Sequence, residues 1–492
     1  MKLQGILFIF CLLINIVHPL FAQEDLSKDT CSISLLFIGD VMQHSSQIAS
    51  AFDENSNKYN YDLCFKYIAP IIKGADIAIA NLEVTFAGPP YTGYPRFSAP
   101  CALADALKKA GVNYVVTANN HSCDRNKKGI ERTINVLDSI GIEHTGTFMH
   151  KSSRDTVYPL IINKNCFKIA LLNYTYGTND IPVPKPNIVN IIDTTLIGKD
   201  LQVAKDSMPD AIIVFMHWGV EYELTPDLKQ KLLTEFCFKN GADLVIGSHP
   251  HVVQQMERYQ YPDTSGKDVF VAYSLGNFVS NQRKRYTDGG AMVEIELKKL
   301  SKNSVKAKTT WINNAGYYLT WVYKKDSAGK TDFFILPVSE YRGDTTLITS
   351  KTDRDMMDLF ANDSRSLFNI YNIQVPEYNY DTLAGSWRIS SENVELSTDT
   401  FVNTESVIQD TIIIYKIQFF ASSNFLDIST LQNDMQDMIS TEHNKEGIIR
   451  YMLGPFYNYE NAKRYLNKLV SDSSFKDAFI VTYKNGRRIT FK

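Results

Sequence analysis

The chain has 492 residues, of which 44% are hydrophobic, so it is long enough for two or three domains with cores of their own. Its formal net charge of −3 gives no excess of basic residues, and a nucleic-acid partner is therefore not expected. Beyond the N-terminal segment, no stretch is long and apolar enough to predict a membrane span.

The first 22 residues have the pattern of a secretory signal peptide. Lys2 precedes an apolar stretch over residues 6–17, which is short for a transmembrane helix, and Ala22 is a small residue at a plausible cleavage point. Leu20 stands where a small residue is expected two positions before the cut, so an uncleaved membrane anchor is the alternative. We expect a cleaved signal over residues 1–22 and export to the periplasm or cell envelope.

Cleavage would remove one of the seven cysteines. In an oxidising compartment the other six can form up to three disulfides, whose pairing the sequence does not determine. Cys123 lies two residues after His121 and could be a soft metal ligand. A packed small hydrophobic side chain is the more common role of such a cysteine, and we favour it.

Several apolar runs have the length and composition of buried β-strands, and each ends in polar residues suited to metal or phosphate chemistry. The runs and the residues that follow them are Ile33–Ile38 with Gly39-Asp40, Ala75–Ala80 with Asn81-Leu82-Glu83, Tyr114–Thr117 with Asn119-Asn120-His121, Ala211–Met216 with His217-Trp218-Gly219, and Val269–Tyr273 with Ser274-Leu275-Gly276-Asn277. Helix-like stretches over residues 102–110 and 127–139 separate some of them. This alternation predicts an α/β fold with a largely parallel sheet, whose strand ends line a ligand crevice.

The most informative segment is Gly247-Ser248-His249-Pro250-His251, which follows another apolar run. Histidine is scarce, with nine in the whole chain, and here two lie one residue apart. Both imidazoles can turn toward one metal-sized space, because Pro250 stiffens the loop between them. Two unrelated histidines in a surface loop are the alternative interpretation.

The polar residues that follow these strands are expected to gather at one edge of the sheet. Each has an ordinary alternative role, as a turn former, a helix cap, a core histidine or a solvated charge. Their recurrence at successive strand ends favours a shared metal site. The donors are nitrogen and oxygen without a cysteine, which favours Zn, Mn, Fe or a similar divalent ion, and a carboxylate between two such ions could bridge them.

These motifs, in this order, resemble those of the CapA-type poly-γ-glutamate capsule biosynthesis proteins over about residues 31–300. That family is similar to the calcineurin-like metallophosphatases, so the resemblance implies a four-layer α-β-β-α sandwich with two divalent metal ions. Its metal ligands would be Asp40, Glu83, Asn120, His217, His249 and His251, with Glu83 as the bridge. His121 would donate a proton to a leaving group.

The chain departs from the metallophosphatase pattern in two places. Met42 stands where those enzymes have a histidine two residues after the first aspartate, and Glu83 stands where an aspartate is usual. His44 could replace the missing histidine or could be an ordinary loop residue, and Asn277 is a further possible metal or substrate contact. Phosphatase activity therefore does not follow from the resemblance, and whether the domain is an enzyme stays open.

We expect the metallophosphatase-like domain to span residues 30–345, with aromatic and β-branched residues between 309 and 338 forming its last strands. Residues 346–411 are rich in Ser, Thr, Asn and Asp and are expected to be a linker, although Met356–Phe368 could be helical. From residue 412 the pattern predicts a small ferredoxin-like α+β module, β-α-β-β-α-β in order, with helices over residues 431–439 and 461–470.

Residues 412–492 resemble the SPOR domain, which binds peptidoglycan freed of its stem peptides. The matching residues are Tyr415, Ile417, Gln418, Phe419, Tyr451, Gly454, Pro455, Phe456, Ala462 and Phe479-Ile480. Phe420-Ala421-Ser422 replaces the usual residues after the first strand. Gln418, Phe419 and Tyr451 are the expected contacts to glycan strands, by hydrogen bonding and stacking. A plain packing module is the alternative.

The sequence thus predicts an exported envelope protein with a CapA-like metal-dependent hydrolase or transferase domain, localised by peptidoglycan binding. Its partners would be glycan strands and an anionic envelope polymer or precursor. An activated water or a substrate nucleophile would attack a phosphoryl or amide-type bond, with His121 protonating the leaving group. The alternative is a non-catalytic scaffold for polymer export or for anchoring to the cell wall.

Overall fold

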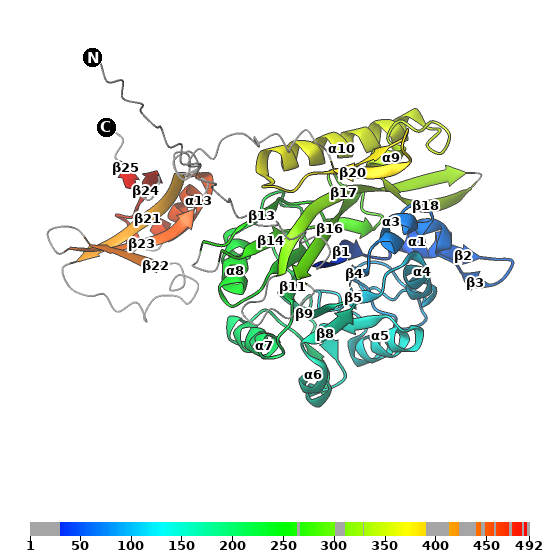
Figure 1. Cartoon of the computed structure of the whole chain (residues 1–492), viewed down its shortest axis with the longest axis horizontal. Coiled ribbons are helices and arrows are strands. Elements are labelled where there is room, and N and C mark those ends of the chain that lie inside the picture. Colours follow the sequence, from blue (N-terminus) through cyan, green and yellow to red (C-terminus); the bar gives the residue numbers. More distant parts are fainter. Residues whose placement is uncertain are drawn as a thin grey trace, which may run out of the picture. The chain divides into compact units, whose positions relative to one another are not determined.

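The computed structural model describes residues 30–262, 266–300, 310–327, 329–389, 413–422, 439–443, 448–456, 459–471, 475–484 and 487–489. The chain divides into two compact units, Met1–Val394 and Glu395–Lys492, each of which is described by itself (Figure 1). The predicted signal peptide lies outside the described residues. In the described part of the chain, no helix has the length and apolar character that crossing a membrane requires.

The first unit contains a sheet of eight strands in the order β18-β17-β16-β1-β4-β5-β6, with β15 paired to β1. Its strands are β1 (Thr30–Val41), β4 (Ile77–Leu82), β5 (Tyr114–Val116), β6 (Glu143–Thr145), β15 (Asn277–Val279), β16 (Gly289–Leu300), β17 (Thr310–Ser327) and β18 (Lys330–Pro337). β1, β4, β5 and β6 run parallel, as expected for strands joined through helices, whereas β16, β17 and β18 form an antiparallel meander.

A second sheet has six strands in the order β13-β14-β12-β11-β9-β8. They are β8 (Leu160–Lys164), β9 (Phe167–Thr175), β11 (Ala211–His217), β12 (Leu244–Ser248), β13 (Met256–Gln260) and β14 (Asp268–Ala272). The four central strands are parallel, and β8 and β13 close the edges in antiparallel pairing. Every residue of β11 and β12 is buried, which is why both read as continuous apolar runs.

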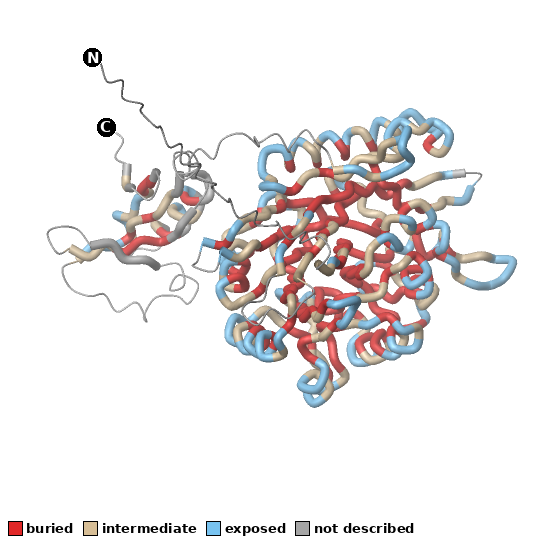
Figure 2. The backbone as a smooth tube through the Cα atoms, viewed as in Figure 1, coloured by how far each residue is buried: buried red, intermediate tan, exposed pale blue. Residues whose placement is uncertain are grey.

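The two sheets pack face to face, and helices cover their outer faces (Figures 1 and 2). Alternate residues of β1 show this division: Phe37 packs in the core between the sheets, and Ile38 packs against the helices. The first sheet is covered by α1 (Ser45–Ala51), α2 (Asp62–Phe65), α3 (Ala69–Gly74), α4 (Ala102–Ala110) and α5 (Asn126–Ile140). The second is covered by α7 (Thr194–Asp206) and α8 (Leu228–Lys239). The predicted mixed α/β fold is confirmed.

A disulfide joins Cys31, near the start of β1, to Cys166, in the turn between β8 and β9. It therefore links the first sheet to the second, across a sequence separation of 135 residues. The other cysteines of the described residues, Cys64, Cys101, Cys123 and Cys237, are free. Cys123 is buried in a small apolar cluster with Ala118 and Ile130, in agreement with the packing role favoured from the sequence.

The structure differs from the linker expected over residues 346–411 in the part that it describes, residues 346–389, and residues 390–411 lie outside the described residues. The helix considered possible over Met356–Phe368 is present. α10 (Lys351–Tyr371) lies along the first unit and buries Met357, Phe360 and Phe368 in the core between the sheets (Figure 1). The short hairpin of β19 (Tyr378–Asp381) and β20 (Ser386–Ile389) packs against the other, helix-covered face of the first sheet, with Tyr378 stacked on Tyr318. The polar composition of this segment reflects the solvent-facing side of an amphipathic helix, which is why it was mistaken for a linker.

The second unit contains a five-stranded antiparallel sheet in the order β22-β23-β21-β24-β25. Its elements are β21 (Ile413–Ser422), β22 (Ile439–His443), β23 (Ile449–Phe456), α13 (Tyr459–Ser471), β24 (Phe479–Lys484) and β25 (Arg487–Ile489). The strands and the helix α13 follow the predicted order, and β25 is an additional edge strand. The helix predicted over residues 431–439 falls outside the described residues, except for Ile439, which begins β22.

Candidate metal centre

The polar residues predicted from the strand ends do meet in one place. β1, β4 and β5 of the first sheet and β11 and β12 of the second end around a common centre, where each contributes buried side chains. These side chains are Asp40, Glu83, Asn120, His121, His217, His249 and His251. Side chains from both sheets therefore converge on a site that is closed to bulk solvent.

Asp40 anchors one side of this centre. Its Oδ2 lies 3.1 Å from Nδ1 of His251, and its Oδ1 accepts a hydrogen bond of 2.8 Å from the side-chain amide of Asn81. The same amide nitrogen lies 3.2 Å from Nδ1 of His217, so Asn81 links an aspartate to a histidine. Burial acts to raise the pKa of Asp40, but the hydrogen bond and charge of His251 outweigh it and hold the pKa below its ordinary value.

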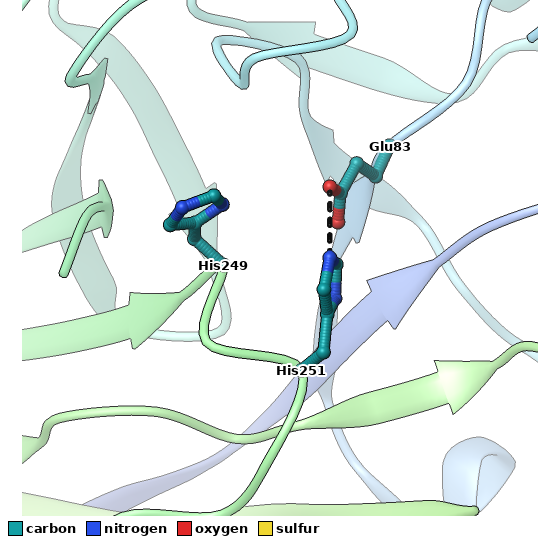
Figure 3. A group of neighbouring side chains, drawn as sticks. All are labelled: Glu83, His249 and His251. Carbon is teal, nitrogen blue, oxygen red and sulfur yellow. Dashed lines mark ion pairs between the residues drawn. The ribbon is translucent and has the colours of Figure 1, made fainter. Parts of the chain in front are cut away.

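The carboxylate of Glu83 faces the imidazole of His251, with His249 beside them (Figure 3). Its Oε1 lies 3.6 Å from Nε2 of His217 and 4.0 Å from Nε2 of His251. Ligand atoms of Glu83, His249 and His251 all lie within 4.8 Å of one another, and so do those of Asp40, Glu83 and His217. Glu83 is thus the residue common to two potential ligand groups.

Both carboxylate oxygens of Glu83 are buried without a hydrogen-bond partner. Burial, followed by the nearby charge of Asp40, raises the pKa of Glu83 well above its ordinary value. A buried carboxylate without partners is unfavourable unless a positive charge neutralises it. Divalent cations supply that charge, so this side chain fits a metal site.

Two histidines of the centre, His217 and His249, are held neutral by burial, as metal ligands must be. Burial lowers the pKa of His249 to about 3 and that of His217 well below its ordinary value. Nε2 of His217 lies 2.9 Å from Oδ1 of Asn120, and Nδ1 of His249 is buried without a partner. The ring of Tyr176 packs 4.5 Å from that of His249, which closes the centre on this side.

The His249-Pro250-His251 loop has a strained backbone. His249 and His251 have φ angles of 103° and 59°, in a region that residues other than glycine seldom adopt. Tyr222, with φ of 69°, donates its backbone N–H to the carbonyl of Pro250 at 2.8 Å and so supports the loop. Strain of this kind persists where surrounding structure holds it, and here it directs both imidazoles toward Glu83.

His121 lies beside the ligand groups and belongs to neither of them. Its Nδ1 is 2.8 Å from Oδ2 of Asp124, and its ring contacts the edge of Phe97 with centroids 4.5 Å apart. The backbone N–H of Phe97 donates to the same oxygen of Asp124 at 2.6 Å, which fixes the carboxylate. An imidazole held in this way by a carboxylate is suited to proton transfer.

His44, the candidate to replace the histidine that Met42 displaces, has a partner outside the two ligand groups. Its Nδ1 accepts a hydrogen bond of 3.1 Å from the backbone N–H of Asn281, and it is in neither ligand group. Burial lowers its pKa to about 4. Asn277 pairs with Asp40 between β15 and β1, and its Oδ1 is buried without a partner, so it can still contact a metal or a substrate.

Two residues of the centre were not given a role in the sequence-based prediction. Asn81 belongs to a motif that was recognised, but its link between Asp40 and His217 depends on the register of two strands. Asp124 follows His121 by three residues, a spacing that brings the two together within a tight turn. The only sequence signal for it was an acidic residue close after a candidate catalytic histidine.

The predicted glycan contacts of the second unit differ in how far their side chains are exposed. Phe419 and Tyr451 are only 6% and 1% exposed, so they belong to the interior of the unit and cannot offer a stacking surface. Gln418 is half-buried and its Oε1 accepts a hydrogen bond from Arg488 at 3.2 Å. Phe420 and Phe479 are 40% and 45% exposed, so their rings are open to solvent.

Residues 34–282 match the family described as "Bacterial capsule synthesis protein PGA_cap". The chain is 28% identical over 285 residues to "Capsule biosynthesis protein CapA" of Bacillus anthracis, covering 55% of this chain and 65% of that protein. It is 27% identical over 285 residues to "PGA biosynthesis protein CapA" of Bacillus subtilis (strain 168), covering 56% of this chain and 69% of that protein.

Solved structures show more distant likeness. The NAD nucleotidase (NadN) of Haemophilus influenzae has 12% identity and a TM-score of 0.37, over 93% of this chain and 96% of that one. A 5'-nucleotidase from Candida albicans SC5314 has 7% identity and a TM-score of 0.30, over 68% and 58%.

Proposed function

The chain belongs to the bacterial capsule synthesis protein PGA_cap family, and we propose that it is an exported cell-envelope protein with a metal-dependent hydrolase or transferase domain. This domain would act on a capsule or envelope polymer, or on a precursor of one. The single observation that carries the proposal is Glu83, a fully buried carboxylate that lacks hydrogen-bond partners and is shared by two ligand groups.

The donor set fits two divalent cations. The surrounding fold, two sheets between layers of helices, would be a sandwich of the metallophosphatase kind. Asp40, Glu83 and His217 would hold one ion, and Glu83, His249 and His251 would hold the other, with the amide oxygen of Asn120 close to His217. All these donors are oxygen or nitrogen atoms, which suit Mn, Fe or Zn. Two such ions, when bound, polarise a phosphoryl or carbonyl oxygen and lower the pKa of water.

The protein's own contribution to the reaction would come from His121 and Asp124. The carboxylate of Asp124 orients the imidazole of His121 through Nδ1, so that Nε2 is the atom that would pass a proton to a leaving group. Phe97 excludes water from one edge of the ring. Such a proton donor serves a phosphoester or an amide-type bond equally, because both release a basic oxygen or nitrogen.

We propose that the second unit is a SPOR-like module that localises the protein on peptidoglycan. The strand order β22-β23-β21-β24 supports this, since it is the order of a ferredoxin-like sheet with one extra edge strand. The exposed rings of Phe420 and Phe479, with Gln418 nearby, would supply stacking and hydrogen bonds to a sugar chain.

The test is turnover by the full mature chain loaded with Mn, Fe or Zn, measured on phosphoesters and on γ-glutamyl amides. Glu83→Gln is the matched variant, since it keeps the size of the side chain and removes its charge. We expect metal-dependent turnover by the wild type and none by Glu83→Gln with its fold retained. Metal and polymer binding without turnover of any of these substrates would instead favour the scaffold function.

A further inference from the structure

Asn173 is a polar side chain at the edge of the apolar core between the two sheets. It lies on β9 and continues the alternating series of Ile169 and Leu171, both of which belong to that core. Asn173 is fully buried, with 0% of its surface exposed, and it lies two residues before β9 ends at Thr175. A buried amide is unfavourable unless its hydrogen bonds are made, so the partners of Asn173 indicate its role.

The side-chain amide of Asn173 connects the two sheets. Its Oδ1 accepts the backbone N–H of Ala118 at 2.7 Å, in the segment that follows β5 of the first sheet. Its Nδ2 donates to the carbonyl of Phe215 at 3.1 Å, in β11 of the second sheet. Both ends of the amide are therefore paired, and each has its partner in a different sheet.

These two partners lie just before residues of the metal centre. Ala118 precedes Asn120 by two residues, and Phe215 precedes His217 by two residues. Oδ1 of Asn120 lies 2.9 Å from Nε2 of His217, so the two segments that the amide joins meet again inside the centre. The amide of Asn173 therefore restricts how far the two segments can move apart.

The backbone of Asn173 is itself held by side chains. Its N–H donates to the hydroxyl of Tyr158 at 3.0 Å, and its carbonyl accepts the side-chain amide of Asn190 at 3.1 Å. Oδ1 of Asn190 accepts Nε–H of Arg154 at 2.7 Å. A side chain on a backbone fixed in this way can position its partners, because it has little freedom of its own.

Gly146 provides the space in which Asn173 reaches Ala118. A Cβ atom at residue 146 would overlap Oδ1 of Asn173 and lie 2.6 Å from the backbone nitrogen of Ala118. Gly146 also has a φ of 110°, which side chains other than hydrogen disfavour. A larger residue here would displace one partner of the hydrogen bond, so the bond depends on two positions of the sequence.

We propose that Asn173 is a positioning residue of the metal centre, which fixes the segment that carries Asn120 relative to the strand that carries His217. The inference rests on the proposed function in one respect, namely that the centre holds metal ions. It adds that the alignment of the two sheets at this centre depends on one buried amide. Residues next to metal ligands commonly act in this way, by orienting the ligands rather than by binding the ion.

The two potential ligand groups should respond differently to the loss of this amide. One group contains His217, and the hydrogen bond from Asn173 lies two residues before it in the same strand. The other takes His249 and His251 from the loop after β12. Loss of the amide should therefore weaken the binding of one ion more than that of the other, which a general loosening of the fold would not do.

The experiment is a calorimetric titration of the metal-free full mature chain with Mn²⁺, for the wild type and for Asn173→Leu. Leucine keeps the branched shape of the side chain and removes both of its hydrogen bonds. The Kd of one ion should rise by about 10–100-fold, the usual effect of losing a residue that orients a ligand, and that of the other ion by less than about threefold.

Asn113→Leu is the matched control. Oδ1 of Asn113 accepts the backbone N–H of Ala78 at 2.8 Å, a hydrogen bond of the same kind at the opposite end of β5 from the metal centre. This variant should lose stability through the missing hydrogen bond and leave the Kd of both ions unchanged.

A second measurement needs no metal. The imidazole nitrogen signals of His121 and His217, assigned with His→Gln variants, are recorded by NMR in the metal-free protein. They should shift in Asn173→Leu, because the two segments are no longer held together, and stay in place in Asn113→Leu. Gly146→Ala should reproduce the shifts and the loss of Mn²⁺ affinity, and it tests the same hydrogen bond where Asn173→Leu fails to fold.

Two results would overturn the proposal. One is a folded Asn173→Leu or Gly146→Ala in which the Kd of both ions and the imidazole signals are unchanged, which would make Asn173 a part of the core only. The other is equal weakening of both ions. A wild type that binds no Mn²⁺ would contradict the proposed function instead, and the imidazole signals would then decide by themselves whether Asn173 positions the two segments.

Discussion

Oδ2 of Asp40 lies 3.1 Å from Nδ1 of His251, although 211 residues separate them in the chain. Asp40 ends a strand of the first sheet, and His251 follows a strand of the second. The contact shows that the two sheets meet at the ends of their parallel strands, and that the candidate centre belongs to both. Neither sheet alone could complete a ligand group, since Glu83 comes from the first and His249 from the second.

Substitution of His121 should separate proton transfer from metal binding. His121→Gln is expected to lower turnover by about 10²–10⁴-fold, the usual contribution of a general acid, while metal content stays at the wild-type level. Asp124→Asn should lower turnover less, because the amide can still contact Nδ1 of His121 but orients the imidazole less firmly. Steady-state kinetics and metal analysis of both variants check this. Loss of metal in His121→Gln would contradict its place outside the ligand groups.

His44 should contribute to the pH dependence of stability in the metal-free protein. Burial lowers the pKa of His44 to about 4 from an unfolded value of about 6.5, so the unfolded chain binds a proton that the folded one does not. The free energy of unfolding should therefore fall as pH drops from about 6.5 to 4, by up to about 1.4 kcal/mol per pH unit from this group. Above pH 6.5 the group has no effect.

The variant His44→Asn tests this, because the Asn side chain offers an oxygen near the position of Nδ1. Its free energy of unfolding, measured by urea titration at several pH values, should fall less steeply between pH 6.5 and 4 than that of the wild type. Equal slopes for the two proteins would mean that His44 titrates normally in the folded state.

Much of the first unit could be predicted because its chemistry follows short-range patterns. Buried strands appear as apolar runs, and the residues after them, such as Asp40 and His249, gather because parallel strands end at one edge. Asp124 could not be assigned, since its contact with His121 depends on the conformation of a turn. The pairing of Cys31 with Cys166 could not be assigned either, because it depends on how two separate sheets stack.

The burial of Phe419 and Tyr451 could not be predicted from the sequence pattern either. An aromatic residue in a strand of a small α+β module can face either the helices or the solvent, and alternation does not say which face is which. α10 shows the converse, since its polar face dominated the composition of residues 346–389 and concealed an apolar stripe.

The disulfide between Cys31 and Cys166 should stabilise the first unit. Linking residues 135 apart restricts the unfolded chain, and the double variant Cys31→Ala/Cys166→Ala is expected to lose about 2–4 kcal/mol of unfolding free energy. Reductant should lower the stability of the wild type to a similar extent and leave the double variant unaffected. Urea titration with and without reductant measures both. A wild type that is insensitive to reductant would show that the bond does not contribute.

Exposed aromatic rings should carry peptidoglycan binding by the second unit. Phe479→Ala is expected to weaken co-sedimentation with peptidoglycan freed of stem peptides by several-fold, because it removes an exposed ring that would stack on a sugar. Leu383→Ala, at a fully exposed position of the first unit, is the matched control. Undiminished sedimentation of Phe479→Ala would remove this ring from the proposed binding surface.

The most direct measurement is the metal content of the full mature chain and of three variants, Asp40→Ala, Glu83→Gln and His249→Ala. The account predicts about two equivalents of Mn, Fe or Zn in the wild type. Glu83→Gln should lose both, since Glu83 is common to the two ligand groups, whereas Asp40→Ala and His249→Ala should each weaken one. Variants that fold and retain two equivalents, or a folded wild type that binds no divalent metal, would contradict it.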